Sequence, residues 1–190
     1  MVTNGPTQAG AGHSGLPFRS SSDTEGDVAR TLGKLEAGGK DLAIIRLAAN
    51  SPGMFRPFVH MADALLNRSR LQARVRECVI LHLAAHLDVR YEWAEHVPMS
   101  ADAGVTDEER AVLATGTLDD LSSFTDLEQM ALRTSRAIAD GAITPDDWAT
   151  ATKVLGEGAM VDLVLTVAWW GAFVPTVIDA LGLVDPAATS

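Results

Sequence analysis

Residues 72–96 read QARVRECVILHLAAHLDVRYEWAEH, and this stretch decides which kind of fold the chain adopts. Four of its side chains recur at spacings of three and four residues, which places them on one face of a helix: Val75, Val79, His82 and His86. Glu77 lies on a second stripe, whose other members are mostly apolar. Because burial of an unpaired carboxylate is costly, we expect Glu77 to be protonated, paired or turned toward a wet pocket.

A second helix is predicted after a turn near Asp88–Val89, and it carries Glu92 and His96 four residues apart on one face. If the two helices pack antiparallel, Glu77 lies about eleven residues before the turn and His96 about seven after it, an offset of roughly 6 Å at the helical rise. The sequence therefore predicts that Glu77, Glu92 and His96 converge. Two carboxylates and an imidazole are the groups that general acid–base chemistry needs.

The rest of the chain has weak strand signals and many helix start and stop signals. Three segments have the pattern of capping boxes: Thr106–Glu109, Thr125–Glu128 and Thr144–Asp147. Three glycines lie where the preceding helices should end in left-handed caps: Gly104, Gly116 and Gly141. We predict an all-α fold, a compact bundle of about eight to nine helices near residues 25–36, 40–50, 52–66, 72–87, 90–103, 107–115, 126–140, 145–155 and 158–181. Pro175 should kink the last of them.

The chain has 190 residues, one cysteine and a formal net charge of −10. The acidic balance argues against nucleic acid and against an anionic membrane surface as partners. A single cysteine excludes a disulfide scaffold and a CxxC redox centre. The longest uncharged stretch, residues 163–178, is shorter than a bilayer span, so we predict a buried helix there. We expect a cytoplasmic protein with a flexible arm over residues 1–22 and one domain over residues 23–190.

Three segments of the chain resemble the carboxymuconolactone decarboxylase/AhpD-like family: Arg74–Ala84, Tyr91–His96 and Ala103–Glu109. The flanking residues 47–52, 163–167 and 181–182 fit as well, so that the resemblance covers roughly residues 40–185. It implies the AhpD-like helical bundle, a homo-oligomer, and an enzyme that uses no metal or organic cofactor. The thiol-bearing members use a CxxC pair, whose positions are held here by Val89 and Glu92. The chain therefore resembles the branch without these thiols.

This branch implies a lyase or isomerase that transfers a proton on a small unsaturated carboxylate, lactone or related carbonyl substrate. His96 would shuttle the proton, because its ordinary pKa is near neutrality, and Glu77 and Glu92 would be its carboxylate partners. Residues 51–76 hold five arginines, and the guanidinium group matches carboxylate geometry. Four residues are candidates for substrate binding: Arg76, Arg56, Tyr91 as an oxyanion donor, and His60, which shares a helix face with Arg56.

Simpler interpretations remain open for several of these residues. Glu77 has an alternative role as the anchor of a buried salt bridge, and Glu92 as a surface partner of His96. His82 and His86 form a metal-binding spacing without a third ligand, so we predict no metal site. Trp169 and Trp170 suit a core or a subunit interface.

The alternative function is a non-enzymatic oligomer that binds a small ligand or a partner protein on the same fold. We do not expect a thiol peroxidase, because Cys78 lies in a helix without a resolving partner. The helix over residues 159–178 is apolar nearly all round and must be buried on every side, which fits a homo-oligomer.

Overall fold

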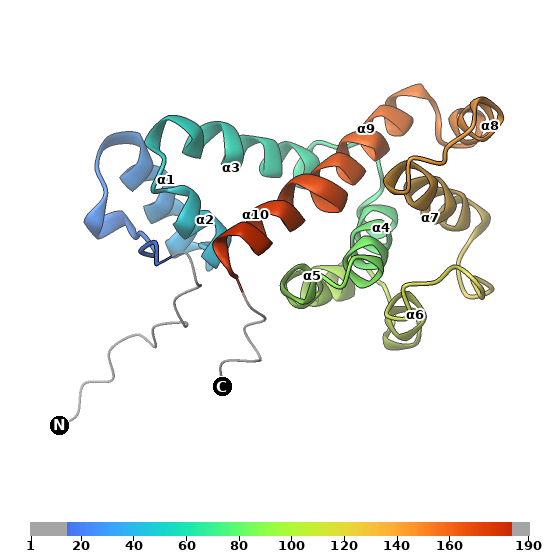
Figure 1. Cartoon of the computed structure of the whole chain (residues 1–190), viewed down its shortest axis with the longest axis horizontal. Coiled ribbons are helices and arrows are strands. Elements are labelled where there is room, and N and C mark those ends of the chain that lie inside the picture. The colour runs from blue at the N-terminus through green and yellow to red at the C-terminus, as the bar shows by residue number, and fades with distance from the viewer. Residues whose placement is uncertain (1–14, 184–190) are drawn as a thin grey trace. The chain divides into compact units, whose positions relative to one another are not determined.

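The computed structural model describes residues 15–183, and every regular element in that range is helical (Figure 1). The helices are α1 Gly26–Ala37, α2 Ala43–Ala48, α3 Pro52–Asn67, α4 Ala73–His86, α5 Arg90–Asp102, α6 Asp107–Leu113, α7 Asp126–Ala139, α8 Pro145–Leu155, α9 Glu157–Ala168 and α10 Val174–Leu181. Residues Glu157–Leu181 form one continuous helical run, so the predicted all-α class and the predicted number of helices are confirmed.

The predicted helix ends are confirmed where the sequence shows capping signals. The hydroxyls of Thr106, Thr125 and Thr144 each accept a hydrogen bond from the backbone N–H three residues later. In each case the acidic side chain at that third position accepts a hydrogen bond from the threonine N–H in return. The three predicted cap glycines all have positive φ, where a Cβ atom would be strained: Gly104, Gly116 and Gly141.

The contacts divide the chain into two compact units, where the sequence predicts one domain over residues 23–190. The first unit comprises Met1–Ala64 and Ile178–Ser190, and the second comprises Leu65–Val177. A small apolar cluster of the first unit contains Val28, Leu32, Ala49 and Phe55. The larger core of the second unit is built from α4, α7 and α9 with their neighbours.

The predicted arm over residues 1–22 is only partly open to comparison, because residues 1–14 lie outside the described range. Arg19 Nε donates to Asn50 Oδ1 at 2.9 Å, and the Ser21 backbone N–H donates to Glu36 Oε1 at 2.8 Å. Residues Ser21–Asp23 form a short 3-10 helix. The polar groups of residues 19–23 thus form hydrogen bonds with side chains of the first unit, and these residues are not a free arm.

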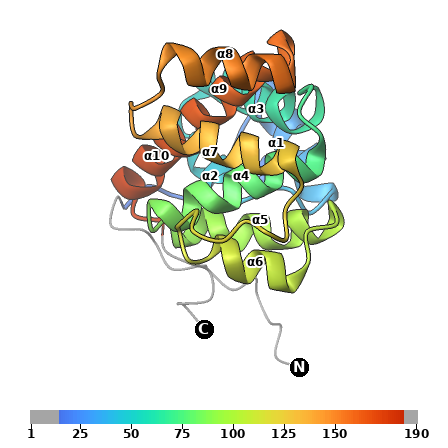
Figure 2. The same ribbon diagram turned by 90° about the vertical axis from the view of Figure 1, so that its right-hand side faces the viewer.

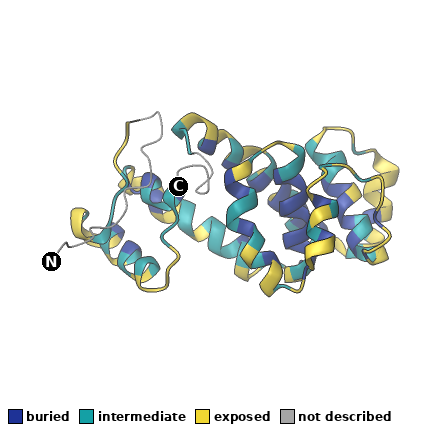
Figure 3. Ribbon diagram, turned by 90° about the horizontal axis from the view of Figure 1, so that it is seen from below, coloured by how far each residue is buried: buried dark blue, intermediate teal, exposed yellow. Residues whose placement is uncertain are grey.

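Helix α4 is the central element of the second unit, where it packs against α5, α6, α7 and α9 (Figure 2). Ten consecutive residues, Val75–Ala84, are buried. Figure 3 shows buried stretches of ribbon among intermediate and exposed ones. A helix that is buried on every side needs a partner for each polar group that it carries. Its functional candidates are therefore placed inside the second unit.

The helical run Glu157–Leu181 contains a wider turn just before Pro175. Residues Trp169–Phe173 form a π-helical turn, in which the N–H of Val174 donates to the carbonyl of Trp169, five residues back. Pro175 has no N–H to donate to the residue four positions earlier, and the wider turn accommodates this loss. The predicted irregularity is therefore present, but it lies in the turn before the proline.

By length and composition alone, this run is the one helix among the described residues that could cross a membrane, and 33% of its most apolar window is buried. Within the single chain this run is only partly buried, and its burial on every side in a homo-oligomer stays a prediction. Val161, Leu165 and Phe173 are 55%, 39% and 46% exposed. The run thus presents an apolar face to its surroundings.

Arg74 connects α4 to the capping boxes of two other helices. Its Nη2 donates to Glu109 Oε1 at 2.5 Å, and its Nε donates to Glu128 Oε1 at 2.7 Å. Nη1 donates to the carbonyl of Gly104. The hydrogen bond from Arg74 is the main reason why the pKa of the Glu109 carboxyl lies below its usual range. One guanidinium therefore binds the two acids that cap α6 and α7.

We predict that Arg74→Met lowers the free energy of unfolding by about 3 kcal/mol, because two buried carboxylates lose their counter-ion. Urea denaturation at pH 7 measures the change. Arg90→Met is the matched control, since the Arg90 side chain is 77% exposed and its ion pair with Asp88 is 3.6 Å long. Its effect should stay within about 0.5 kcal/mol. Equal effects of the two variants would show that Arg74 does not anchor these helices.

Candidate functional site

Glu77 of α4 and His96 of α5 meet inside the second unit. The imidazole Nδ1 of His96 lies 2.8 Å from Glu77 Oε2, and the two residues are 5% and 1% exposed. Asp88 takes a left-handed conformation between the helices, with φ of 54°, and the chain reverses there. The predicted approach of Glu77 and His96 across an antiparallel helix pair is confirmed.

Two further charged residues complete the cluster. Glu92 Oε2 lies 3.5 Å from His96 Nε2, so this carboxylate faces the opposite side of the imidazole from Glu77. Arg76 contacts Glu77 Oε1 through both Nε and Nη2, at 3.2 Å each. All four residues are buried. The site therefore holds two carboxylates, a guanidinium and an imidazole away from bulk water.

The carboxylates determine the protonation state of His96. Burial by itself lowers the pKa of this imidazole, but the hydrogen bond to Glu77 and the contact with Glu92 outweigh burial and raise the pKa to about 9. His96 is therefore an imidazolium at neutral pH, and the charges of the four-residue cluster then sum to zero. In this state His96 has a proton to give and no lone pair with which to accept one.

Trp170 is the site residue that the sequence did not reveal. Its ring centroid lies 5.6 Å from that of His96, with the two ring planes at 88°. The π-helical turn Trp169–Phe173 carries this side chain, and Trp170 is buried while Phe173 is exposed. The sequence indicates only an apolar aromatic pair at this point, because no local spacing relates Trp170 to a residue 74 positions earlier.

Tyr91 is buried beside the cluster, but its hydroxyl has a different partner from the substrate oxyanion predicted from the sequence. Burial raises the pKa of the neighbouring Glu95, and the charge of Glu92 raises it further, whereas a hydrogen bond with Tyr91 opposes the shift. The Tyr91 hydroxyl is thus already engaged with Glu95. Glu95 itself is half-buried and is a second carboxyl group close to Glu92.

Arg56 and His60 belong to the first unit, whereas the Glu77–His96 cluster belongs to the second. They do line one pocket together, as their helical spacing predicts, and the residues opposite them come from α1. Arg56 Nη1 is 2.9 Å from Asp27 Oδ2. Of the predicted substrate-binding residues, only Arg76 and Tyr91 therefore lie in the same unit as His96.

Cys78 is buried within α4, and burial raises the pKa of its thiol to about 12. A thiol with this pKa is protonated at neutral pH and is a poor nucleophile. The environment of Cys78 therefore agrees with an inert core cysteine.

His82 is completely buried, and neither of its ring nitrogens has a hydrogen-bond partner within the described part of the chain. Burial lowers the pKa of His82 to about 4, so the ring is neutral at pH 7. It stacks on His86, with ring centroids 6.2 Å apart, and His86 Nε2 contacts Asp140 Oδ1 at 3.1 Å. Across residues 15–183, no three His, Cys, Asp or Glu side chains are placed to hold a metal ion together.

Comparison of the chain with protein-family profiles, with curated proteins and with solved structures gave no significant match.

The two buried histidines predict a stability maximum near pH 6.5. The folded pKa of His96 lies above its ordinary value of 6.5, so its contribution is complete below pH 6.5 and is lost as the pH rises through 9. The folded pKa of His82 lies below 6.5, so stability falls as the pH drops from 6.5 through 4. We call these two losses the alkaline limb and the acid limb, and each lowers the free energy of unfolding by about 3 kcal/mol.

Urea denaturation at pH 4.5, 6.5 and 9 measures both limbs. His82→Leu should remove the loss on the acid side, and His96→Gln should remove the loss on the alkaline side. His60→Gln, at an exposed position, is the control and should leave both limbs in place. An alkaline limb that survives in His96→Gln would show that another group causes it.

Proposed function

We propose that this protein is a cofactor-independent acid–base catalyst of the carboxymuconolactone decarboxylase type, with His96 as its general acid. One observation carries the proposal: the buried Glu77 carboxylate holds the imidazole of His96 at Nδ1, while Nε2 lies 3.5 Å from the Glu92 carboxylate. The Nδ1 contact fixes the ring and keeps it protonated. The Nε2–H is then the proton that is available for transfer.

The chemistry that fits a general acid is loss of carbon dioxide from a small unsaturated lactone acid. As the C–C bond to the carboxylate breaks, its electron pair moves into the conjugated carbonyl and gives a dienolate. The Nε2–H of His96 protonates this dienolate at a distant carbon, and His96 regains a proton from water. No redox partner is needed, because the electron pair stays in the product and the proton is replaced.

Each neighbour of His96 has a separate part in this scheme. Glu77 orients the imidazole and stabilises its charge, as a buried carboxylate does for a catalytic histidine. Arg76 acts on Glu77, since its guanidinium contacts that carboxylate directly. Glu92 stands on the Nε2 side, where it faces the transferred proton. Arg76 is thus better suited as a positioning residue than as a substrate ligand.

The burial of the cluster is compatible with two functions: acid–base catalysis and a non-enzymatic role on the same fold. Low dielectric surroundings strengthen the interaction of an imidazolium with a developing enolate. The same four residues also satisfy one another's charges, which is what a structural ion-pair network requires. A non-enzymatic protein that binds a small ligand on this fold is therefore the second candidate.

We predict that His96→Gln lowers turnover at least about 100-fold, because glutamine cannot supply a proton. The assay supplies carboxymuconolactone and related unsaturated lactone acids in D₂O, and it measures carbon dioxide release and deuterium uptake into the product. Glu92→Gln is the second variant, because it alters the Nε2 side of His96 and leaves the Nδ1 bond to Glu77 in place.

His86→Gln is the matched control, since His86 lies apart from the cluster and bonds to Asp140. Circular dichroism and a thermal melt establish that each variant is folded. Unchanged turnover in folded His96→Gln would exclude the mechanism. Saturable binding of these acids by the wild type without any conversion would favour the second candidate.

The exposed apolar face of α9 and the following turn supports a homo-oligomer. Val161, Leu165 and Phe173 contribute to this face, and the Phe173 ring stacks on Trp169 with centroids 4.8 Å apart. The same helix carries Asp162, whose carboxylate accepts a hydrogen bond from the Arg70 backbone N–H at 2.6 Å. A helix tied by a charged residue to its own unit suits a protein contact in the cytoplasm better than lipid.

We predict that light scattering after size exclusion gives a mass of two or more times 20.1 kDa at micromolar concentration. Leu165→Glu should shift the protein to a single chain, because it places a charge on this face. Leu87→Glu, at another exposed apolar position, should leave the mass unchanged. A wild-type protein that is monomeric at this concentration would refute the oligomer.

A further inference from the structure

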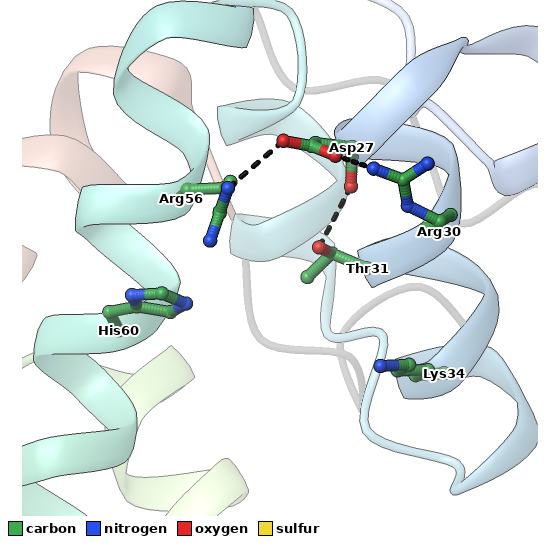
Figure 4. A pocket seen from close by; sticks show the side chains of 6 residues that line it. All are labelled: Asp27, Arg30, Thr31, Lys34, Arg56 and His60. Carbon is green, nitrogen blue, oxygen red and sulfur yellow. Dashed lines mark hydrogen bonds and ion pairs between the residues drawn. The ribbon is translucent and has the colours of Figure 1, made fainter.

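The polar pocket that Arg56 and His60 line lies wholly within the first unit, between α1 and α3, and has a volume of about 330 Å³ (Figure 4). Six residues line it: Asp27, Arg30, Thr31, Lys34, Arg56 and His60. The α1 residues follow helical spacing along one side of the pocket, and Arg56 and His60 are one turn apart on the other. Two facing rows of polar side chains thus flank a space that is open to solvent.

The charge of this pocket is opposite to that of the chain. Three cationic side chains, Arg30, Lys34 and Arg56, face a single carboxylate, Asp27, in a protein whose formal net charge is −10. Asp27 forms ion pairs with both arginines and so holds the two guanidinium groups close together at one end of the pocket. A net positive pocket in an acidic protein favours an anionic ligand.

The other end of the pocket has free hydrogen-bond donors. Lys34 and His60 point toward the space between the helices, and within residues 15–183 neither has a hydrogen bond or ion pair (Figure 4). Lys34 lies seven residues after Asp27, which is about 10 Å along the helix axis. The pocket therefore has paired cations at one end and unused donors at the other.

We propose that this pocket binds the phosphate group of a small phosphorylated molecule. Lysine and arginine side chains are the usual ligands of phosphate, and three cations suit a dianion better than a single carboxylate. The volume matches that of sites for small molecules. The overall charge of −10 disfavours nucleic acid as the source of the phosphate. This pocket and the Glu77–His96 cluster belong to different units, and the proposal does not depend on the function proposed for the cluster.

Isothermal titration with inorganic phosphate and with glucose 6-phosphate, in chloride buffer at constant ionic strength, tests the proposal on the full-length protein. Wild type should show saturable binding, and repeating the titration in buffers of higher sodium chloride concentration should give weaker binding. Lys34→Gln and His60→Gln should each weaken binding about fivefold or more, and Lys34→Arg should retain it. His96→Gln should bind phosphate as wild type does, which separates this result from the test of catalysis.

Lys153→Gln is the matched control, because it removes the same charge from an exposed position on α8 in the other unit. Equal weakening by Lys34→Gln and Lys153→Gln would show a bulk charge effect and would overturn the site. Absence of saturable binding by the wild type would overturn it as well. Binding of succinate as tightly as glucose 6-phosphate would refute the assignment to phosphate.

Discussion

The burial of α4 on all sides is the constraint on which the second unit depends. Ten consecutive buried residues include a guanidinium, a carboxylate and an imidazole, none of which can rely on water. Arg76 and Glu77 solve this by pairing with each other and with His96. His82 has no such partner among the described residues and remains neutral. The same burial thus produces one charged histidine and one uncharged histidine within a single core.

The opposite states of these histidines show how neighbours decide what burial does to an imidazole. Desolvation acts in the same direction on both and lowers the pKa of each. Two carboxylates overcome it at His96, whereas at His82 Arg136 and His86 lower the pKa further and Asp140 opposes them only in part. A protonated histidine that is shielded from water is costly unless counter-charges lie beside it. At His96 these come from Glu77 on α4 and from Glu92 on α5.

Much of the fold follows from local signals, and these could be predicted from the sequence. The threonine capping boxes and the glycine caps act within four residues, so the helix ends at Thr106, Thr125 and Gly141 agree closely with the structure. The approach of Glu77 to His96 was also predictable, because one short turn sets the register of two adjacent helices. Trp170 was not, since its contact with His96 depends on packing between distant segments. That Arg56 and His60 belong to the other unit was not predictable either, because no change of composition marks the boundary between the two units.

The π-helical turn beside Pro175 has a consequence for how this helix tolerates changes in length. A π turn holds one more residue than an α-helical turn would, so Trp169–Phe173 amounts to a single-residue insertion in an otherwise regular helix. Five residues in the wider turn advance the helix by about the same rotation as four residues of an α-helix, so the extra residue leaves the faces of α9 and α10 in register. Deleting one residue within the turn would therefore restore α-helical geometry without rotating one flank against the other. A deletion inside α9 or α10, where no wider turn can compensate, would instead rotate the two flanks by about 100° and change which side chains are buried.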